Sequence, residues 1–299
     1  MPERVPDRAA PFHLDRARLR ASFERASESY EAAASLQARI AAELLERLEL
    51  FGFVPGVVLD LGSGTGRITR ELKRRYPRAC VIALDLAYGM LRAARRHQRP
   101  WRRFARVCGD ALRLPVKTGS VDLVFSNLML QWCEPLSVAL AEVRRVLKPS
   151  GFFTFSTFGP DTLYELRSAW AHADGYNHIN QFSDVHEVGD LLVRAGLTEP
   201  VLDVDRFEVE YPNVLTLMRD LKAIGAHNVT EGRSRTLAGR SRLARVQQAY
   251  ESFRRGERLP ATYEVIYGAS WGAAGRSAAS ARDGVVHIAP GSIRRAQRP

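Results

Sequence analysis

The segment LDLGSGTG at residues 59–66 combines one acid with three glycines at alternate positions. Glycines at this spacing allow a tight turn and let a ligand approach bare backbone. Dinucleotide-binding loops usually have the spacing GxGxxG around a pyrophosphate, whereas this chain has GxGxG with Asp60 two residues before the first glycine. An acid at that position would repel a phosphate, and it suits the ammonium group of a methionine moiety. The alternative is a plain glycine turn with a solvated Asp60.

Two further acids follow the next two apolar runs of the chain. Asp85 lies near the end of CVIALDL (80–86), where a carboxylate can accept hydrogen bonds from both hydroxyls of a ribose. Asp110 ends RFARVCGD (103–110), where it can accept a hydrogen bond from the exocyclic amine of adenine. Because the carboxyl ends of parallel strands meet in one crevice, the three acids predict a site for S-adenosylmethionine rather than for a dinucleotide. The residues expected to bind this cofactor, with Met90 and Leu112 on either side of the adenine ring, are Asp60, Gly62, Ser63, Gly64, Gly66, Asp85, Leu86, Met90, Asp110, Ala111, Leu112 and Asn127.

These acids must be positioned by short strands that alternate with helices. Apolar runs between turn signals predict strands, and apolar residues at helical spacing predict helices. The predicted strands are 57–61, 80–86, 103–110, 121–127, 152–158, 202–211 and 262–271. The predicted helices are 14–29, 35–50, 65–77, 87–98, 136–147, one that begins near Asp161 and one that runs from an N-cap at Ser183 to Ala195, with a turn at KPSG (148–151). This alternation is typical of an α/β, Rossmann-like class I methyltransferase fold with a mostly parallel, seven-stranded sheet and helices on both faces.

The chain is expected to form one methyltransferase domain over residues 14–272. Within it, residues 14–50 form an N-terminal helical lid, and residues 213–256 form a basic helical insertion before the last strand. Residues 1–13 are expected to be disordered. The segment 273–299 is rich in Ala, Gly, Ser and Arg and has no amphipathic period, so we expect a flexible basic tail.

The composition favours a protein of the cytoplasm. No apolar run approaches the length of a membrane span, and the N-terminus carries charges where a secretory signal peptide has an apolar core. The three cysteines are odd in number and form no CxxC pair. We therefore expect reduced thiols, with Cys80 and Cys108 buried in apolar strands, and no metal ion.

The net charge of +11 is concentrated in residues 67–106, residues 219–258 and the tail. Such a surface can attract nucleic acid, anionic lipid or an acidic protein, and it is equally consistent with an arginine-rich surface that is only solvated. Few aromatic residues interrupt the basic runs, which disfavours recognition of RNA. Charge alone therefore does not identify the substrate.

The end of the fourth predicted strand bears on what is methylated. Enzymes that methylate the amino groups of bases usually carry Asn/Asp-Pro-Pro-aromatic at this point, whereas this chain has SNLMLQWC (126–133). No cysteine pair suggests the covalent chemistry of cytosine methylation. Base methylation is therefore disfavoured, and nucleic acid is not the expected partner.

Several segments outside the cofactor site resemble the malonyl-acyl-carrier-protein O-methyltransferases of biotin synthesis, the BioC family. The resemblance covers roughly residues 20 to 271 and does not include the tail. Its segments are FERASESY (23–30), SNLMLQWCEPLSVALAEVRRVLKPSG (126–151), HINQF (178–182) and LMRDLKAIGAHNVTEGR (217–233). The resemblance implies methylation of the free carboxylate of a malonyl thioester, which disguises the precursor so that fatty-acid enzymes elongate it. A second hypothesis is a methyltransferase-like assembly factor or protein-modifying enzyme, since the fold alone does not settle the activity.

A carboxylate acceptor needs few chemical groups in the protein, because it is already a nucleophile at neutral pH and needs no general base. We expect neutral donors to aim it: Tyr30 from the lid, with His178 and Asn180 as further candidates. Tyr30 could instead be a half-buried helix residue, and His178 and Asn180 could tie a loop to its backbone. Gln131 and Trp132 are expected to line the substrate pocket, with core packing as the alternative.

The basic insertion is expected to dock an acyl carrier protein, which is strongly acidic. Lysine and arginine at the pocket mouth would steer such a carrier and make the association rate sensitive to salt. The candidate docking residues are Lys222, Arg233, Arg235, Arg240 and Arg242. Whether the malonyl group is carried by the protein or by coenzyme A stays open at this point.

Overall fold

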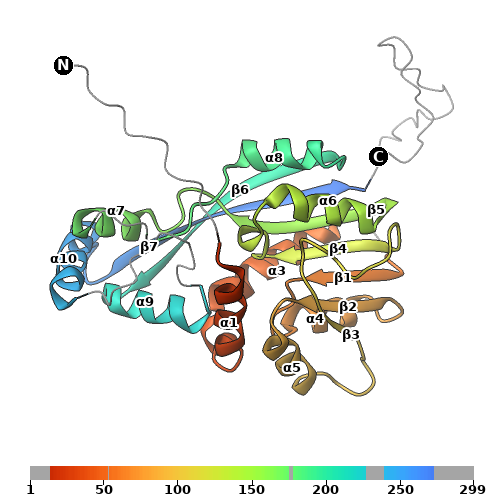
Figure 1. Cartoon of the computed structure of the whole chain (residues 1–299), viewed down its shortest axis with the longest axis horizontal. Helices are drawn as coiled ribbons and strands as arrows, with labels where there is room; N and C mark the ends of the chain where they lie inside the picture. Colours follow the sequence, from red (N-terminus) through yellow and green to blue (C-terminus); the bar gives the residue numbers. More distant parts are fainter. Residues whose placement is uncertain (1–13, 53, 175–177, 227–238, 273–299) are drawn as a thin grey trace, which may run out of the picture.

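The computed structural model describes residues 14–52, 54–174, 178–226 and 239–272, so the predictions for 1–13 and 273–299 fall on residues outside these ranges. The strands are β1 (Val57–Leu61), β2 (Cys80–Asp85), β3 (Ala105–Cys108), β4 (Val121–Asn127), β5 (Leu147–Phe158), β6 (Thr198–Tyr211) and β7 (Leu259–Trp271). They form one seven-stranded sheet in the order β3-β2-β1-β4-β5-β7-β6 (Figure 1). The five strands β3-β2-β1-β4-β5 pair in parallel with their neighbours, whereas β7 runs antiparallel to both β5 and β6. The predicted fold is confirmed.

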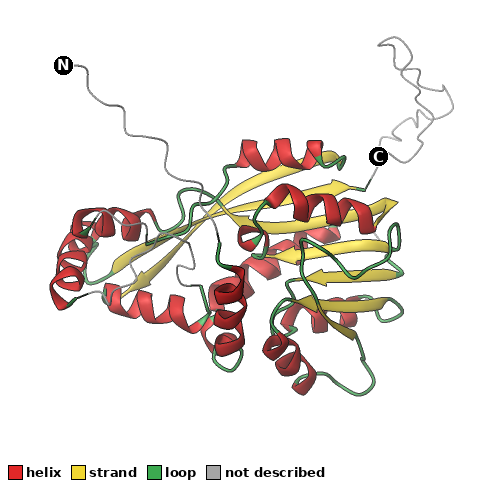
Figure 2. Cartoon of the chain, in the orientation of Figure 1, coloured by secondary structure: helices red, strands yellow, loops and turns green. Residues whose placement is uncertain are grey.

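Helices cover both faces of this sheet (Figure 2). They are α1 (Arg16–Ala26), α2 (Tyr30–Ala33), α3 (Ser35–Glu49), α4 (Arg67–Arg75), α5 (Tyr88–Arg96), α6 (Leu136–Val146), α7 (Tyr164–Ala173), α8 (Val185–Arg194), α9 (Val214–Ala223) and α10 (Arg240–Tyr250), with 3-10 turns at Leu130–Trp132 and Glu251–Phe253. Successive strand residues face opposite sides: Val58 packs with α3, α4 and α5, and Leu59 packs with α6 and α8. The central strands are therefore buried on both faces, as their continuous apolar sequences require.

Helix α3 lies against β4 and β5 through its apolar stripe. Ile40, Leu44 and Leu48 recur at helical spacing and are almost completely buried. Burial of each such side chain contributes roughly 1.5–3 kcal/mol relative to exposure. The stripe therefore fixes the orientation of α3, and with it the position of Gln37 near the start of the helix.

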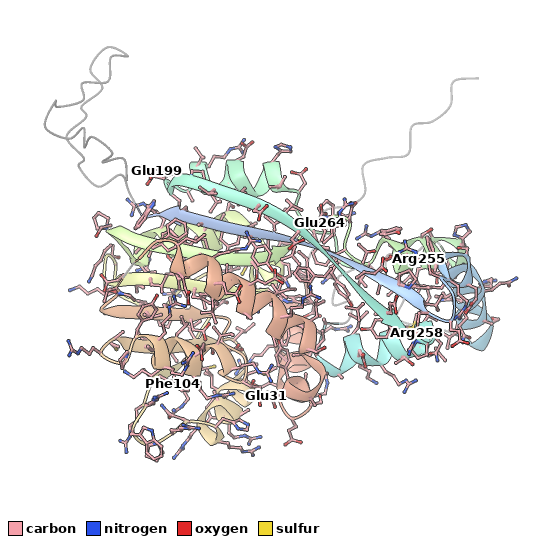
Figure 3. All side chains as sticks on the ribbon, turned by 180° about the vertical axis from the view of Figure 1, so that it is seen from behind. Glu31, Phe104, Glu199, Arg255, Arg258 and Glu264 are labelled. Carbon is pink, nitrogen blue, oxygen red and sulfur yellow. The ribbon has the colours of Figure 1, made fainter. Side chains whose placement is uncertain are left out.

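Strands β6 and β7 form a long antiparallel ribbon that extends beyond the parallel part of the sheet, and helices α7, α9 and α10 pack around its far end (Figure 1). Figure 3 labels Glu199 near one end of the ribbon, Arg255 and Arg258 at the other, and Glu264 between them. The far end is held by buried polar contacts, because the Tyr250 hydroxyl donates to the carbonyl of Pro260 at 2.8 Å. Helix α1 lies between this end of the ribbon and the parallel strands (Figure 1).

The structure corrects three details of the predictions. Helix α8 is capped by Asp184, whose carboxylate accepts the backbone N–H of Glu187, and not by Ser183. The segment 148–151 belongs to β5, and its Lys148 pairs with Asp122 of β4 at 2.7 Å. Cys80 and Cys108 are exposed, since they are the first residue of β2 and the last residue of β3.

Candidate functional site

The three glycines after β1 all adopt left-handed backbone conformations. Gly62, Gly64 and Gly66 have φ angles of 79°, 54° and 76°. A Cβ at Gly62 would lie 2.3 Å from Cγ of Met129, and a Cβ at Gly66 would lie 2.8 Å from Cβ of Ala94 in α5. All three glycines are therefore favoured by backbone conformation, and Gly62 and Gly66 also by close packing around the turn.

Asp85 lies at the carboxyl end of β2 and holds the glycine turn. Its Oδ2 accepts the backbone N–H of Gly64 at 2.8 Å, and its Oδ1 accepts that of Ala87 at 2.8 Å. Burial raises the pKa of Asp85 to about 6, although these backbone hydrogen bonds favour its charged form. The carboxylate lines a cavity at this edge of the sheet and can accept further hydrogen bonds from a ligand there.

Asp60, at the end of β1, lies deeper in the structure. It is almost completely buried, and its Oδ2 accepts the hydroxyl of Thr69 in α4 at 2.5 Å. Burial raises the pKa of Asp60 to about 7, and the nearby Asp85 raises it further against the effect of the Thr69 hydrogen bond. Asp60 lines a small cavity with Ser63 and Tyr30, next to the cavity that Asp85 lines.

Asp110 follows β3 and lines the same cavity as Asp85. Its Oδ1 accepts the backbone N–H of Leu112 at 2.9 Å, and its Oδ2 forms an ion pair with Arg16 of α1. Helix α1 is also held to α5, because the two carboxylate oxygens of Glu24 accept the first two backbone N–H groups of that helix at 2.7 and 2.6 Å. One ion pair and two hydrogen bonds to a carboxylate therefore tie the N-terminal helix to this side of the site.

Helix α1 and the turn after it are tied to the end of α9 on the other side. The Ser22 hydroxyl donates to the carbonyl of Gly225 at 3.0 Å, and the Ser29 hydroxyl donates to that of Ala223 at 2.8 Å. The two hydrogen bonds bracket Arg25 on α1 and hold it beside the end of α9. One helix thus contacts elements that are far apart in the sequence.

A first cavity brings together most of the residues predicted to bind a cofactor. Asp60 and Ser63 line the adjoining small cavity instead, and Gly66 lines neither. The predicted cofactor residues in the first cavity are Gly62, Gly64, Asp85, Leu86, Met90, Asp110, Ala111, Leu112 and Asn127, and Tyr30, Gln131 and Trp132 line it as well.

The chemistry of this donor set fits S-adenosylmethionine. Carboxylates stand at the ends of three neighbouring strands, and the walls include apolar Met90 and Leu112. The buried hydroxyl of Ser63 has no hydrogen-bond partner among the described residues, so it can serve a polar group of a ligand. Two acids whose pKa values are raised by burial favour a ligand that brings a positive charge.

A second, larger cavity opens beside the first. It encloses about 1860 Å³ of empty space, mouth included, against about 970 Å³ for the first. His178 and Asn180 line the second cavity and not the first, whereas Tyr30 lines the first and not the second. The structure therefore does not bring the three predicted aiming residues together. The residues that line both cavities are Gln37, Trp132, Phe158, Ile224 and Ala226.

Tyr30 lies on the glycine turn, where Cε1 of its ring would be 3.8 Å from a Cβ at Gly64. Burial raises the pKa of Tyr30 to about 12, and the nearby Asp85 acts in the same direction. The phenol therefore stays neutral at physiological pH. It can donate a hydrogen bond but cannot act as a base.

His178 is held in a cluster that the sequence did not reveal. Its Nε2 lies 2.7 Å from Oδ1 of Asp174, and its ring stacks on Trp170 with centroids 3.6 Å apart. Arg242 of α10 lies 3.5 Å from Oδ2 of the same Asp174. Nearby, Asn180 is almost completely buried, and its Oδ1 has no partner in the described part of the chain. The sequence signal that could have predicted the contact with His178 was the carboxylate of Asp174 four residues before it.

The cations at the mouth of the second cavity differ in part from those expected. Arg25 of α1 and Arg219 and Lys222 of α9 line it and are exposed. Arg242 instead turns inward to Asp174. Arg233, Arg235 and the side chain of Arg240 lie outside what the structure describes. Arg25 was missed because nothing in the sequence places α1 beside α9.

The sheet order, the glycine turn after β1 and the acids after β2 and β3 define a class I, S-adenosylmethionine-dependent methyltransferase. A family model described as a methyltransferase domain matches residues 59–155. The malonyl-acyl-carrier-protein O-methyltransferase of Methylovorus sp. is 51% identical over 269 residues, which cover 88% of this chain and 91% of that protein. The enzyme of the same description from Laribacter hongkongensis is 50% identical over 281 residues, or 91% of this chain and 95% of that one. The chain belongs to the malonyl-acyl-carrier-protein O-methyltransferase family.

Solved structures share the fold at low sequence identity. A chain from the Haloferax volcanii complex of the Trm112 methyltransferase activator gives a TM-score of 0.56 at 18% identity, covering 86% of this chain and 99% of its own. The YcgJ protein of Bacillus subtilis gives 0.52 at 16% identity, covering 74% and 94%. This likeness shows the fold alone. Among the described residues no helix is both long and apolar enough to cross a membrane, and a cytoplasmic location stays a prediction.

Proposed function

We propose that this chain transfers a methyl group from S-adenosylmethionine to the free carboxylate of a malonyl group held as a thioester on an acyl carrier protein. The family resemblance assigns the reaction to an early step of biotin synthesis. Support comes from relatives of that description that are 51% and 50% identical over most of the chain. The absence of a metal from the reaction is part of the same proposal.

The observation that carries this proposal is the junction of two cavities of different character. The first has acids at strand ends, as a cationic adenosyl ligand requires. The second has apolar walls that include Leu163, Leu166 and Met218, and cations at its mouth. A long neutral arm with a carboxylate at its tip could enter the second cavity from a docked carrier and reach the first at the junction.

The cofactor roles proposed from the sequence follow the geometry of the first cavity. Asp85 would accept the ribose hydroxyls, Asp110 the adenine amine, and Asp60 with Ser63 the ammonium end. Met90 and Leu112 would flank the adenine ring. As part of the same proposal, residues 14–50 form a lid within the methyltransferase domain 14–272. Helix α1 of this lid is bound to both sides of the site.

When bound, S-adenosylmethionine supplies a methyl group on a positively charged sulfur. The substrate carboxylate would form a bond to that methyl carbon as the carbon–sulfur bond broke with its electrons to sulfur, and no proton would move. Opposite charges disappear, so the exclusion of water by Phe158 and Ile224 favours the transition state. In-line positioning by the protein can supply up to roughly 7–11 kcal/mol of the barrier reduction.

The three candidate aiming residues divide between the two ligands. Tyr30 would act from the cofactor side as a neutral donor beside the glycine turn. His178 and Asn180 would contact the arm of the substrate in the second cavity. Trp132 would line the place where the two ligands meet, and Gln131 would line the first cavity beside it.

The carrier would dock at the cationic mouth of the second cavity. Lys222 stays in this role, and Arg25 and Arg219 join it because they are exposed on the same rim. Arg233 and Arg240 remain candidates in the insertion 213–256. Arg242 braces Asp174 and would support docking only indirectly. An acidic carrier would be steered by this rim in a salt-dependent way.

Mass spectrometry of malonyl carrier protein incubated with the enzyme and S-adenosylmethionine tests the function directly. We expect a gain of one methyl group on the malonyl moiety and none on acetyl carrier protein. If the malonyl carrier stays unmodified while a client protein gains the methyl group, the chain is a protein-modifying relative instead. Parallel reactions with malonyl-coenzyme A determine whether the carrier protein is preferred.

A further inference from the structure

The junction of the two cavities presents hydrogen-bond donors without a formal positive charge. Of the five residues that line both cavities, Phe158, Ile224 and Ala226 are apolar. The other two are Gln37, with a side-chain amide, and Trp132, with an indole N–H. Cations of the second cavity such as Arg25 and Lys222 are exposed at its mouth instead.

Neither donor is used within the part of the protein that the structure describes. In the described ranges the Gln37 amide and the Trp132 indole N–H form no hydrogen bond, although both residues are partly buried. Their frameworks are nevertheless fixed. The backbone carbonyl of Gln37 accepts Nδ2 of Asn127 at 3.2 Å, and the Trp132 ring packs edge-on against Phe23 with centroids 5.5 Å apart. Donors on a fixed backbone or ring that have no partner among the described residues are suited to a ligand with strong acceptors.

We propose that the N–H groups of Gln37 and Trp132 form a carboxylate clamp that holds and aims the malonyl carboxylate at the cavity junction. The clamp rests on the proposed function and names the groups that recognise the reacting end of the substrate. Neutral donors orient a carboxylate while leaving its negative charge uncompensated by a fixed cation. The oxygen therefore keeps its nucleophilicity, which a directly paired arginine would reduce.

The first test removes each donor and keeps the shape of the side chain as far as possible. Gln37→Leu and Trp132→Phe should each lower kcat/KM for the malonyl thioester about 10- to 100-fold, as expected for one hydrogen bond to a charged group. Calorimetry should show an unchanged Kd for S-adenosylmethionine. It should show weaker binding of malonyl thioester to the complex with S-adenosylhomocysteine, which cannot react.

The second test replaces the donor by a titratable acceptor of the same size. Gln37→Glu should repel the substrate carboxylate while the new side chain is ionised. Its kcat/KM relative to the wild type, at saturating cofactor, should therefore rise as the pH falls from about 8 to about 6 and more of the glutamate is protonated. The matched control is Gln248→Glu on the exposed face of α10, which should show no such trend.

Wild-type turnover of malonyl carrier protein tests the proposed function. The Kd values of the variants for malonyl thioester and the pH dependence of the Gln37→Glu ratio test the clamp, so the two proposals can fail separately. The clamp is overturned if Gln37→Leu and Trp132→Phe bind malonyl thioester as tightly as the wild type. It is also overturned if the Gln37→Glu ratio does not change with pH, or if the loss lies in cofactor binding.

Discussion

Arg16, at the start of α1, forms an ion pair with Asp110, the residue proposed to accept the adenine amine. The N-terminal helix is thereby bound to the rim of the cofactor cavity by a group that the cofactor itself would contact. Arg16→Ala should loosen this attachment, so stopped-flow fluorescence should show faster association and faster dissociation of S-adenosylmethionine. Arg18→Ala, which breaks only the local pair with Asp15, is the control. Equal rates in Arg16→Ala and wild type would show that the ion pair does not restrain the helix.

Asp60 is expected to reduce the stability of the cofactor-free protein at neutral and higher pH. Burial raises its pKa from 3.8 to about 7, so the unfolded chain ionises first and the free energy of unfolding falls as the pH rises through this interval. Asp60→Asn should therefore melt at a higher temperature than the wild type at pH 8, by roughly 2–4 °C for each kcal/mol regained, with the difference shrinking towards pH 4.

The control for Asp60 is Asp122, at which the same substitution should have the opposite effect. Its carboxylate pairs with Lys148 at 2.7 Å and accepts two backbone N–H groups at 2.8 and 3.1 Å. Asp122→Asn should lower the melting temperature at pH 8. A wild-type melting temperature that rises between pH 4 and pH 7 while Asp60→Asn shows no gain would contradict the interpretation of Asp60.

Cofactor affinity should fall as the solution becomes more acidic. The pKa of Asp85 is raised by burial to about 6 and that of Asp60 to about 7, and both acids must be ionised to bind a cationic adenosyl ligand. Calorimetry should show a Kd for S-adenosylmethionine that rises as the pH falls below these pKa values. The rise should be up to about tenfold per pH unit for each acid that becomes protonated. Asp85→Asn should bind more weakly and with a flatter pH dependence. A Kd that is constant between about pH 8 and about pH 6 would argue against ionised acids in the site.

Asp174 is expected to act on the substrate through His178. The contact of 2.7 Å holds the imidazole in the wall of the second cavity. Asp174→Asn should raise KM for the malonyl thioester about 3- to 10-fold with little change in kcat, and Asp174→Asn combined with His178→Asn should be no worse than His178→Asn alone. The control is His172→Asn on the exposed end of α7. Additive effects of the two substitutions would show that Asp174 does not act through His178.

Charge reversal at the cavity mouth should affect the carrier and spare a small substrate. Arg25→Glu combined with Lys222→Glu should raise KM for malonyl carrier protein at least about tenfold, chiefly at low salt, because long-range steering is lost. KM for the malonyl thioester of N-acetylcysteamine should stay within about twofold of the wild type, since only the carrier carries the acidic surface. Arg95→Glu with Arg96→Glu, exposed on α5, changes the charge equally elsewhere. Equal losses with both substrates would rule out docking at this rim.

The gathering of most residues of the candidate cofactor site could be predicted from local sequence. Asp60, Asp85 and Asp110 each follow an apolar run, and the parallel sheet then brings strand ends together without further information. The substrate side could not be predicted in the same way. Gln37 reaches the junction only because the apolar stripe of α3 orients that helix against β4 and β5. Periodicity predicts that stripe but not the point on the sheet where the helix begins.

The same limit explains the shifted roles of the charged residues. Arg242 looked like a free cation in a basic segment, yet the packing of α10 on α7 turns it towards Asp174. Arg25 looked like an ordinary surface residue, yet the hydroxyls of Ser22 in α1 and Ser29 just after it hold this part of the chain beside α9. Contacts between elements distant in the chain decide which charges are exposed, and a single sequence does not encode them in a pattern that can be recognised.

Helix α1 is bound on one flank to α5 and Asp110 and on the other to α9. It is thus a common wall of the two cavities, and a displacement that admits one ligand also disturbs the binding surface of the other. A ligand or substitution that moves α1 is therefore expected to alter both cavities at once, so that the affinity for the methyl donor and the affinity for the acyl arm depend on each other.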